Sequence, residues 1–518
     1  MSMNSSSQTS SSTAGLHVGF FSWALALATG LEYFDNSIFS FFTSYIAGGI
    51  NASPDELVWS TTAYATAAVL GILQQQWWVE RMGYRRYVGA CLLLYAAGAV
   101  LAALCETSVE LACARGLQGY FIGPIMGASR ILIRVSLTSK ERPVATRAFL
   151  TLIVLSSALA PLVGGLLLSY FGWSVLFACT APAGVLFAVL ALLALPDSGY
   201  LHPELRGEPH LLPWLIFAFA QGALQIVMQQ VRFERFSNSP RLPLLALTGI
   251  VLLGWFIWHQ WHHPRPLVRL RALQQKAFRA GLILYVFYYY VSQALSYLIA
   301  RFLESGLDYP PENAGRMVGI TSLISSCALY AYFRYSSRLP HKKWIIVPGF
   351  ALAIFIAFWM TQMPPDVSRS WLIVPMLLRG LLLLFIVVPV ANVTFGVFPA
   401  EEFTHVYRLK NIVRQLTFSF TTATVIIVEQ HRFALHQTRL VEFANPFNPL
   451  YQQTLAGFTR AFELLGYVPS EAHGLALIRI SQIIARQASF LSSLDGFYFL
   501  IGVAVCGGLF AIWQKQID

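Results

Sequence analysis

The stretch VGFFSWALALATGLEYFDNSIFSFFTSYI, residues 18–46, decides the fold class of this chain. A membrane-spanning helix needs about 20 mostly apolar residues, and this stretch is long enough. Its charged residues are Glu32 and Asp35, which lie three positions apart and therefore on one helix face. An ionisable side chain at the centre of a membrane helix costs at least about 2.5–3.5 kcal/mol, so both carboxylates indicate a function.

The composition also predicts a membrane protein. The chain has 518 residues, of which 56% are hydrophobic and 11% are charged, whereas a soluble domain carries about 25% charged residues. Only α-helices and closed β-barrels can span a lipid bilayer. The sequence lacks the short segments of alternating hydrophobicity that are typical of a barrel. We therefore expect an all-α integral membrane protein. The net charge of +11 lies mainly in certain loops, which indicates topology rather than nucleic-acid binding.

Fourteen apolar segments are long enough to be transmembrane helices. Their grouping predicts two six-helix bundles, at 18–196 and 278–518, with an inserted helix pair at 211–262. Two-bundle architectures with a central site are common among secondary transporters. The Ser-rich residues 1–17 are expected to be a disordered cytoplasmic tail. The predicted spans are 18–46, 57–77, 87–105, 111–133, 144–169, 174–195, 211–231, 242–261, 278–303, 313–334, 344–362, 370–398, 404–429 and 494–513.

Loop charge predicts the orientation. One alternating set of loops is rich in Lys and Arg, whereas opposite loops such as 51–56 and 305–313 hold neither. Basic loops stay in the cytoplasm, so we expect both termini there and the long segment 432–493 outside. Within that segment we expect a loop with two helices broken at 466–470, the second of them an amphipathic surface helix around 475–491. The basic loop residues are Arg81, Arg85, Arg86, Arg134, Lys140, Arg142, Arg147, His263, Arg265, Arg269, Arg271, Lys276, Arg279, Arg338, Lys342 and Lys343.

Short motifs follow one another along the chain. They are FDNSI (34–38), WVERMGYRR (78–86), RGLQG (115–119), ALAPLVGG (158–165) and NIVRQLTFS (411–419). In this order they resemble the motifs of the major facilitator superfamily, in its fourteen-span drug:proton antiporter branch, and most of all its EmrB-type multidrug exporters. The resemblance covers nearly the whole chain and implies the major facilitator fold with 14 transmembrane helices.

The resemblance also implies roles for matching residues. Asp35 stands at the branch's membrane-embedded acid, and Asn411 and Arg414 match its N-x-x-R segment. Ser156 and Ala160 depart from the pattern, because they replace earlier glycines of the antiporter motif. The gating motif is matched by Glu80, Arg81, Gly83, Arg85 and Arg86, the antiporter motif by Pro161, Gly164 and Gly165, and the R-x-x-Q-G motif by Arg115 and Gln118. We expect Gly83 to permit the sharp turn between the second and third spans. We expect Pro161, Gly164 and Gly165 to let neighbouring helices approach closely and bend.

Proton coupling is assigned to Asp35, Glu32 and Arg115. Burial and a neighbouring carboxylate both disfavour the ionised form of an acid, so we expect Glu32 and Asp35 to share a proton and to titrate as a pair. Arg115 then modulates that site or contacts the substrate. The alternatives are that Asp35 only hydrogen-bonds to a neighbouring helix and that Arg115 forms a structural ion pair.

Several polar and aromatic residues are candidates for substrate contact, although most aromatic stripes only pack. Arg301, together with Arg130 and Arg379, points to an anionic or zwitterionic substrate, although arginines near helix ends usually snorkel to the interface. The histidines of the run 259–263 have no carboxylate or cysteine beside them, so no metal site is expected. The substrate candidates are Phe34, Gln118, Tyr289, Gln293, Arg301, Asn411 and Arg414.

These observations predict a proton-coupled efflux transporter that exports small amphiphilic compounds, drugs or toxic metabolites by alternating access. The sequence shows no Walker A motif, cofactor motif or catalytic constellation, so we expect no enzyme and no cofactor. One alternative is export of an endogenous anionic metabolite such as a siderophore or an aromatic acid. An importer and a non-transporting membrane sensor are two others. The resemblance implies a bacterial inner membrane, an EmrA-like periplasmic adaptor and an outer-membrane channel.

Overall fold

The computed structural model describes residues 6–53, 56–202, 206, 210–230, 240–335, 343–396, 398 and 400–514. These ranges contain helices and no β-strand, so the all-α prediction is confirmed for them. The elements are α1 (Ser6–Phe41), α2 (Thr43–Gly49), α3 (Leu57–Ala103), α4 (Ser108–Ile122), α5 (Ile125–Ser136), α6 (Arg142–Phe171), α7 (Val175–Ala178), α8 (Thr180–Ala194), α9 (Leu211–Gln230), α10 (Arg241–His262), η2 (Leu270–Gln274), α11 (Lys276–Arg301), η3 (Phe302–Gly306), α12 (Pro311–Tyr335), α13 (Lys343–Thr361), α14 (Arg369–Arg379), η5 (Leu383–Val387), α15 (Val388–Gly396), α16 (Ala400–Val441), α17 (Pro449–Leu464) and α18 (Pro469–Trp513).

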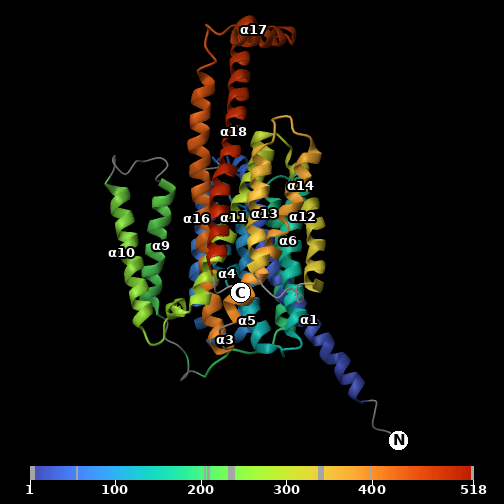
Figure 1. The fold of residues 1–518 in the computed structure, drawn as a ribbon, viewed down its shortest axis with the longest axis vertical. Coiled ribbons are helices and arrows are strands. Elements are labelled where there is room, and N and C mark those ends of the chain that lie inside the picture. Colours follow the sequence, from blue (N-terminus) through green and yellow to red (C-terminus); the bar gives the residue numbers. More distant parts are fainter. Residues whose placement is uncertain are drawn as a thin grey trace.

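The helices form two halves. We call α1–α8 the N-terminal half and α11–α18 the C-terminal half. The halves meet where α6 packs against α12 and where α16 packs against α3 and α5. Helices α9 and α10 pair with each other and stand at the side of the bundle (Figure 1). They lie within 211–262, the segment for which an inserted helix pair was predicted.

Ten helical segments of the described residues are long and apolar enough to cross a membrane. The protein is therefore a multi-pass membrane protein, but the predicted number of fourteen spans is not confirmed. Part of the difference lies in α3, a single element of 47 residues that covers both predicted spans 57–77 and 87–105. The predicted span 111–133 is likewise divided between α4 and α5.

A break inside α3 lies at Gly83. Its φ of 76° and ψ of 161° are non-helical and belong to a region that only glycine adopts readily. A Cβ atom at this position would lie 2.7 Å from Asp197 Oδ1. The next amide, of Tyr84, donates to the Ser198 carbonyl at 2.8 Å. The prediction that Gly83 permits a sharp turn between two spans is therefore confirmed.

Small residues allow α6 to contact helices of both halves. A Cβ atom on Gly164 would lie 2.9 Å from Ile38 Cγ1 of α1, and one on Gly165 would lie 2.9 Å from the Pro311 carbonyl of α12. A Cβ atom on Gly315 of α12 would lie 2.2 Å from the carbonyl of Pro161. The predicted antiporter motif thus lies at a close contact between the halves, where larger side chains would separate the helices.

The N-terminal residues and the segment 432–493 contain more continuous helix than predicted. Residues 6–17, expected to be a disordered tail, form the first part of α1. The two helices predicted within 432–493 are present, because α17 ends at Leu464 and α18 begins at Pro469. The prediction was wrong about their separation from the spans, because α16 continues to Val441 and α18 runs unbroken to Trp513. The surface helix predicted around 475–491 is the first half of α18. Helices α16 and α18 project beyond the other helices, with α17 at the tip (Figure 1).

Candidate functional site

Asp35 is fully buried in α1 and forms an ion pair inside the N-terminal half. Its carboxylate accepts from Arg115 Nη1 at 2.7 Å and from the Tyr95 hydroxyl at 2.9 Å. Arg115, on α4, also donates to Gln118 Oε1 at 2.9 Å and lies over the Phe39 ring. Each buried charge therefore has a counter-charge and hydrogen bonds, which is the condition under which such burial is tolerated.

Glu32 lies on the same helix but pairs across the two halves. Arg414 of α16 donates to Glu32 Oε1, and it also donates to the Tyr33 hydroxyl at 3.1 Å. Gln415 Nε2 lies 3.4 Å from the same Glu32 oxygen. The second oxygen, Oε2, accepts no hydrogen bond from any residue that the structure describes. One ion pair thus connects α1 of the N-terminal half to α16 of the C-terminal half.

The two carboxylates are not placed as a proton-sharing pair, which differs from the expectation. Each accepts from its own arginine, Asp35 from Arg115 and Glu32 from Arg414. Glu32 and its partner are 382 positions apart in the chain. The difference arises because α16 places Arg414 against Glu32 of α1, and a contact between such distant segments cannot be predicted from a local sequence pattern.

A cavity of about 180 Å³ lies between the halves, beside the Glu32–Arg414 pair; we call it the central cavity. Of the predicted substrate residues, Gln293 and Arg414 line it. Tyr289 lines an adjoining cavity of about 90 Å³, and Arg301 lines another of about 280 Å³. These four candidates are therefore close to space that a ligand can occupy.

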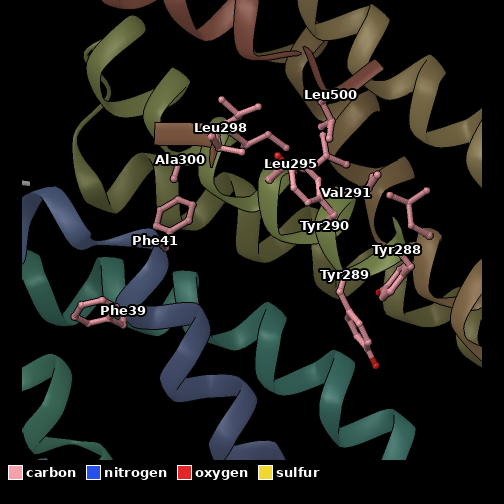
Figure 2. Packing of buried hydrophobic residues seen from close by; sticks show 14 of the residues in the cluster. Phe39, Phe41, Tyr288, Tyr289, Tyr290, Val291, Leu295, Leu298, Ala300 and Leu500 are labelled. Atoms are coloured by element: carbon pink, nitrogen blue, oxygen red, sulfur yellow. The ribbon is translucent and has the colours of Figure 1, made fainter. Parts of the chain in front are cut away.

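Helix α11 supplies an aromatic wall to these cavities. Tyr288 and Tyr289 both line the 90 Å³ cavity. Figure 2 shows Tyr290 packed beside Leu295 and Leu500, whereas Tyr289 points away from that cluster. The hydroxyl of Tyr290 is hydrogen-bonded to the Thr424 hydroxyl at 2.6 Å. Adjacent tyrosines on this helix thus divide between cavity lining and packing within the C-terminal half.

Three other predicted substrate residues do not line the cavities described here. Phe34 is half-buried and packs against the apolar core. Gln118 is fully buried and bonded to Arg115. Asn411 is fully buried on α16, and its amide nitrogen lies 2.9 Å from the position that a Cβ atom on Gly127 would take. Their positions indicate packing and positioning rather than direct contact with a ligand.

The gating motif surrounds the break at Gly83. Glu80 Oε1 accepts from Gln76 Nε2 at 2.9 Å, and the Glu80 carbonyl accepts from the Leu201 amide at 2.9 Å. The Arg81 guanidinium lies 3.8 Å from the centre of the Trp77 ring. The remaining two motif residues, Arg85 and Arg86, are exposed. The motif therefore links the break in α3 to the segment that follows α8.

Sequence reasoning missed several buried charges. Lys410 and Arg408 are buried on α16, each with 3% exposure or less. Glu429, also on α16, accepts from Arg301 Nε at 3.2 Å and from the Tyr297 hydroxyl at 2.8 Å. All three missed residues fall inside the predicted span 404–429. The rule that selected Glu32 and Asp35, a charge inside an apolar span, was sufficient to find them.

Comparison with known proteins adds independent evidence. A family model described as Major Facilitator Superfamily matches residues 25–422. The multidrug export protein EmrB of Haemophilus influenzae is 22% identical over 496 residues, which are 95% of this chain and 94% of that protein. The fatty acid resistance protein FarB of Neisseria gonorrhoeae is 21% identical over 495 residues, 94% of this chain and 96% of that protein.

A solved structure shows the same fold. The crystal structure of a bacterial homologue of the human lysosomal transporter Spinster, inward-facing and unoccupied, superposes with a TM-score of 0.59. The alignment covers 96% of this chain and 99% of that chain, at 15% sequence identity. At this identity the likeness concerns the fold alone.

Proposed function

Because this chain belongs to the major facilitator superfamily, we propose that it is a proton-coupled exporter that moves small amphiphilic compounds by alternating access. Its relatives in the family are transporters, and the chain is accordingly a transporter and not an enzyme. Proton entry drives export in this proposal, with Asp35 and Glu32 as the groups that bind the proton. The transported compound occupies the central cavity.

The Glu32–Arg414 pair is the observation that supports this proposal best. It connects the two halves at the wall of the central cavity, and both side chains are 1% exposed or less. Such a bridge requires an ionised carboxylate. Protonation of Glu32 removes the negative charge and leaves Arg414 as a buried cation without a counter-charge, which is unfavourable until water or a ligand reaches it. Proton binding therefore weakens the contact between the halves on one side of the cavity.

Asp35 has a different role in this proposal. Its partner Arg115 lies in the same half, so protonation of Asp35 rearranges hydrogen bonds without separating the halves. The bond from Arg115 to Gln118 gives the guanidinium a second acceptor when Asp35 is neutral. Asp35 thus acts as a proton-binding group beside the bridging pair, and Arg115 stabilises its ionised form.

We place the protein in the inner membrane of a Gram-negative bacterium, with both termini cytoplasmic and α17 in the periplasm. The tip formed by α17 and its flanking turns exposes large apolar side chains, which suits a docking surface for an EmrA-like adaptor that continues to an outer-membrane channel. These side chains are Phe443, Phe447, Leu450, Leu464 and Leu465.

Export of an endogenous anionic compound is the second candidate function. Basic side chains line the cavities between the halves, among them Arg379 and Arg414 in the central cavity. The name of one relative, the fatty acid resistance protein FarB, refers to anionic amphiphiles. This second candidate function differs from the first in the transported compound, whereas the proposed proton-binding groups are the same.

Everted membrane vesicles test the function. The vesicle lumen is acidified, candidate compounds are added, and the lumenal pH is followed. An exporter that exchanges protons for substrate takes up the compound and raises the lumenal pH. Uptake that leaves the pH gradient unchanged would exclude proton coupling, and no uptake of any compound would favour a non-transporting sensor. Vesicles that lack the protein serve as the control for passive leakage.

A further inference from the structure

Three adjoining cavities lie along the contact between the halves. The central cavity shares Tyr288, Ser292 and Phe418 with the 90 Å³ cavity. That cavity shares Arg130 and Phe395 with a cavity of about 290 Å³ beside the turn between α5 and α6. The three cavities thus form a row from this turn towards the Glu32–Arg414 pair, and we call this row the path.

The walls of this path carry one sign of charge. No Asp or Glu among the residues that the structure describes lines any of the three cavities. Of the basic residues, Arg414 has an ion-pair partner, and the others have none within the described chain. A low-dielectric cleft lined by one sign of charge concentrates ligands of the opposite sign. The basic residues are Arg130, Arg134, Arg142, Arg379, Lys410 and Arg414.

Lys410 is the most enclosed of the cations without an ion pair. It is 2% exposed, and its Nζ lies 5.1–5.3 Å from the ring centres of Tyr407, Tyr285 and Tyr289. Its Nζ donates a long hydrogen bond, of 3.4 Å, to Asn411 Oδ1. Tyrosine rings attract an ammonium group but carry no net charge, so they do not replace a counter-ion.

Arg130 approaches the same place from the N-terminal half. Its guanidinium carbon lies 5.9 Å from the centre of the Tyr407 ring, which Lys410 Nζ also approaches, at 5.1 Å. Arg130 donates to the Thr146 hydroxyl at 3.3 Å and has no carboxylate partner in the described ranges. Two cations from opposite halves therefore converge on one small aromatic cavity that supplies no negative charge.

We infer that Lys410 and Arg130 bind the anionic group of the transported compound, and that the substrates are amphiphilic carboxylates or related organic anions. The apolar part of the compound lies in the central cavity against Tyr288 and Phe418. This inference rests on the proposed function, because it takes the occupant of the path to be the exported compound. It places substrate recognition on groups other than the Glu32–Arg414 pair, so the anion need not displace Glu32.

Equilibrium binding to the full-length protein in lipid nanodiscs tests the inference. The probes are naphthalene-2-carboxylate, its uncharged carboxamide and a naphthyl quaternary ammonium. We expect the wild-type protein to prefer the carboxylate. Removing one charge-assisted contact in Lys410→Met should weaken carboxylate binding by about tenfold or more, and Lys410→Arg should restore most of it. The carboxamide affinity should change by less than about twofold, because an uncharged amide does not need the ammonium.

Lys276→Met is the matched control, because Lys276 is exposed at the start of α11 and lines none of these cavities. If Lys410→Met does not fold, Arg130→Gln tests the same expectation from the other half. Wild-type carboxylate affinity in Lys410→Met or in Arg130→Gln would overturn the inference, as would a wild-type protein that prefers the ammonium probe.

The two proposals fail separately, because binding is measured without a proton gradient. Lys410-dependent carboxylate binding in a protein that shows no proton-driven transport would contradict the proposed function and support the inference. Proton-driven export of the ammonium probe that is unaffected in Lys410→Met would overturn the inference and support the proposed function.

Discussion

Removing Arg414 tests the ion pair that connects the two halves. In Arg414→Met, the carboxylate of Glu32 stays 0% exposed and retains Gln415 Nε2, at 3.4 Å, as a neighbouring donor. Removing one partner of a buried pair costs about 3–5 kcal/mol, whereas replacing both partners with uncharged side chains is often neutral. We therefore expect Arg414→Met to lower the free energy of unfolding by about 3–5 kcal/mol, and Glu32→Gln with Arg414→Met to recover most of that loss.

The assay is denaturant-induced unfolding of the wild type, both single variants and the double variant in the same lipid. Arg316→Met is the matched control, because its pair with Glu312 is partly exposed, at 51% and 30%, and such pairs contribute about 0–1 kcal/mol. An Arg414→Met protein as stable as the wild type would refute the reasoning. So would a double variant no more stable than Arg414→Met, because the loss would then not come from an uncompensated Glu32.

Two further substitutions, each with a control, and one deletion test other contacts. Gly83→Ala should lower the free energy of unfolding by about 1–3 kcal/mol because of backbone strain, and by a further amount because its Cβ clashes with Asp197. Gly172 also has a positive φ but open space around it, so Gly172→Ala should show the strain alone. Equal losses in the two variants would contradict the clash. Gly165→Leu should stop transport because the larger side chain separates α6 from α12. Gly502→Leu should leave transport unchanged, because no atom lies within 4 Å of a Cβ at that position. Full transport by Gly165→Leu would contradict the close contact. Deleting 449–464 should leave vesicle transport intact and abolish co-purification with a co-expressed EmrA-type adaptor, and unchanged co-purification would exclude the tip as the docking surface.

Local sequence rules predicted the parts of the structure that depend on local chemistry. Apolar length identified the helical character of the chain but not its number of spans, since ten candidate spans rather than fourteen are present in the described residues. The cost of burying a charge identified Glu32 and Asp35. Gly83 was predicted to permit a turn, and the backbone at that residue has the positive φ that such a turn requires. The glycines of α6 were predicted at a close helix contact, and Gly165 lies against the start of α12.

Contacts between distant segments were not predictable from these rules. Asp35 and Glu32 look alike in sequence, yet one pairs within its own half and the other across the halves. The helices within 432–493 were predicted, but they were separated from the neighbouring spans because polar residues interrupt the apolar pattern. In the structure, α16 and α18 support each other there, for example through Arg432 Nε and Asp495 Oδ2 at 2.6 Å. Tertiary packing thus extends helices that hydropathy alone divides.

The most direct test of proton coupling compares accumulation with exchange in proteoliposomes, using the naphthyl probe that the wild type transports. We predict that Glu32→Gln and Asp35→Asn lose accumulation driven by a proton gradient. Both variants should still exchange labelled for unlabelled probe without a gradient, because exchange requires alternation of the two halves but no proton release. Gradient-driven accumulation at the wild-type rate in both variants would contradict the assignment of proton coupling to these carboxylates.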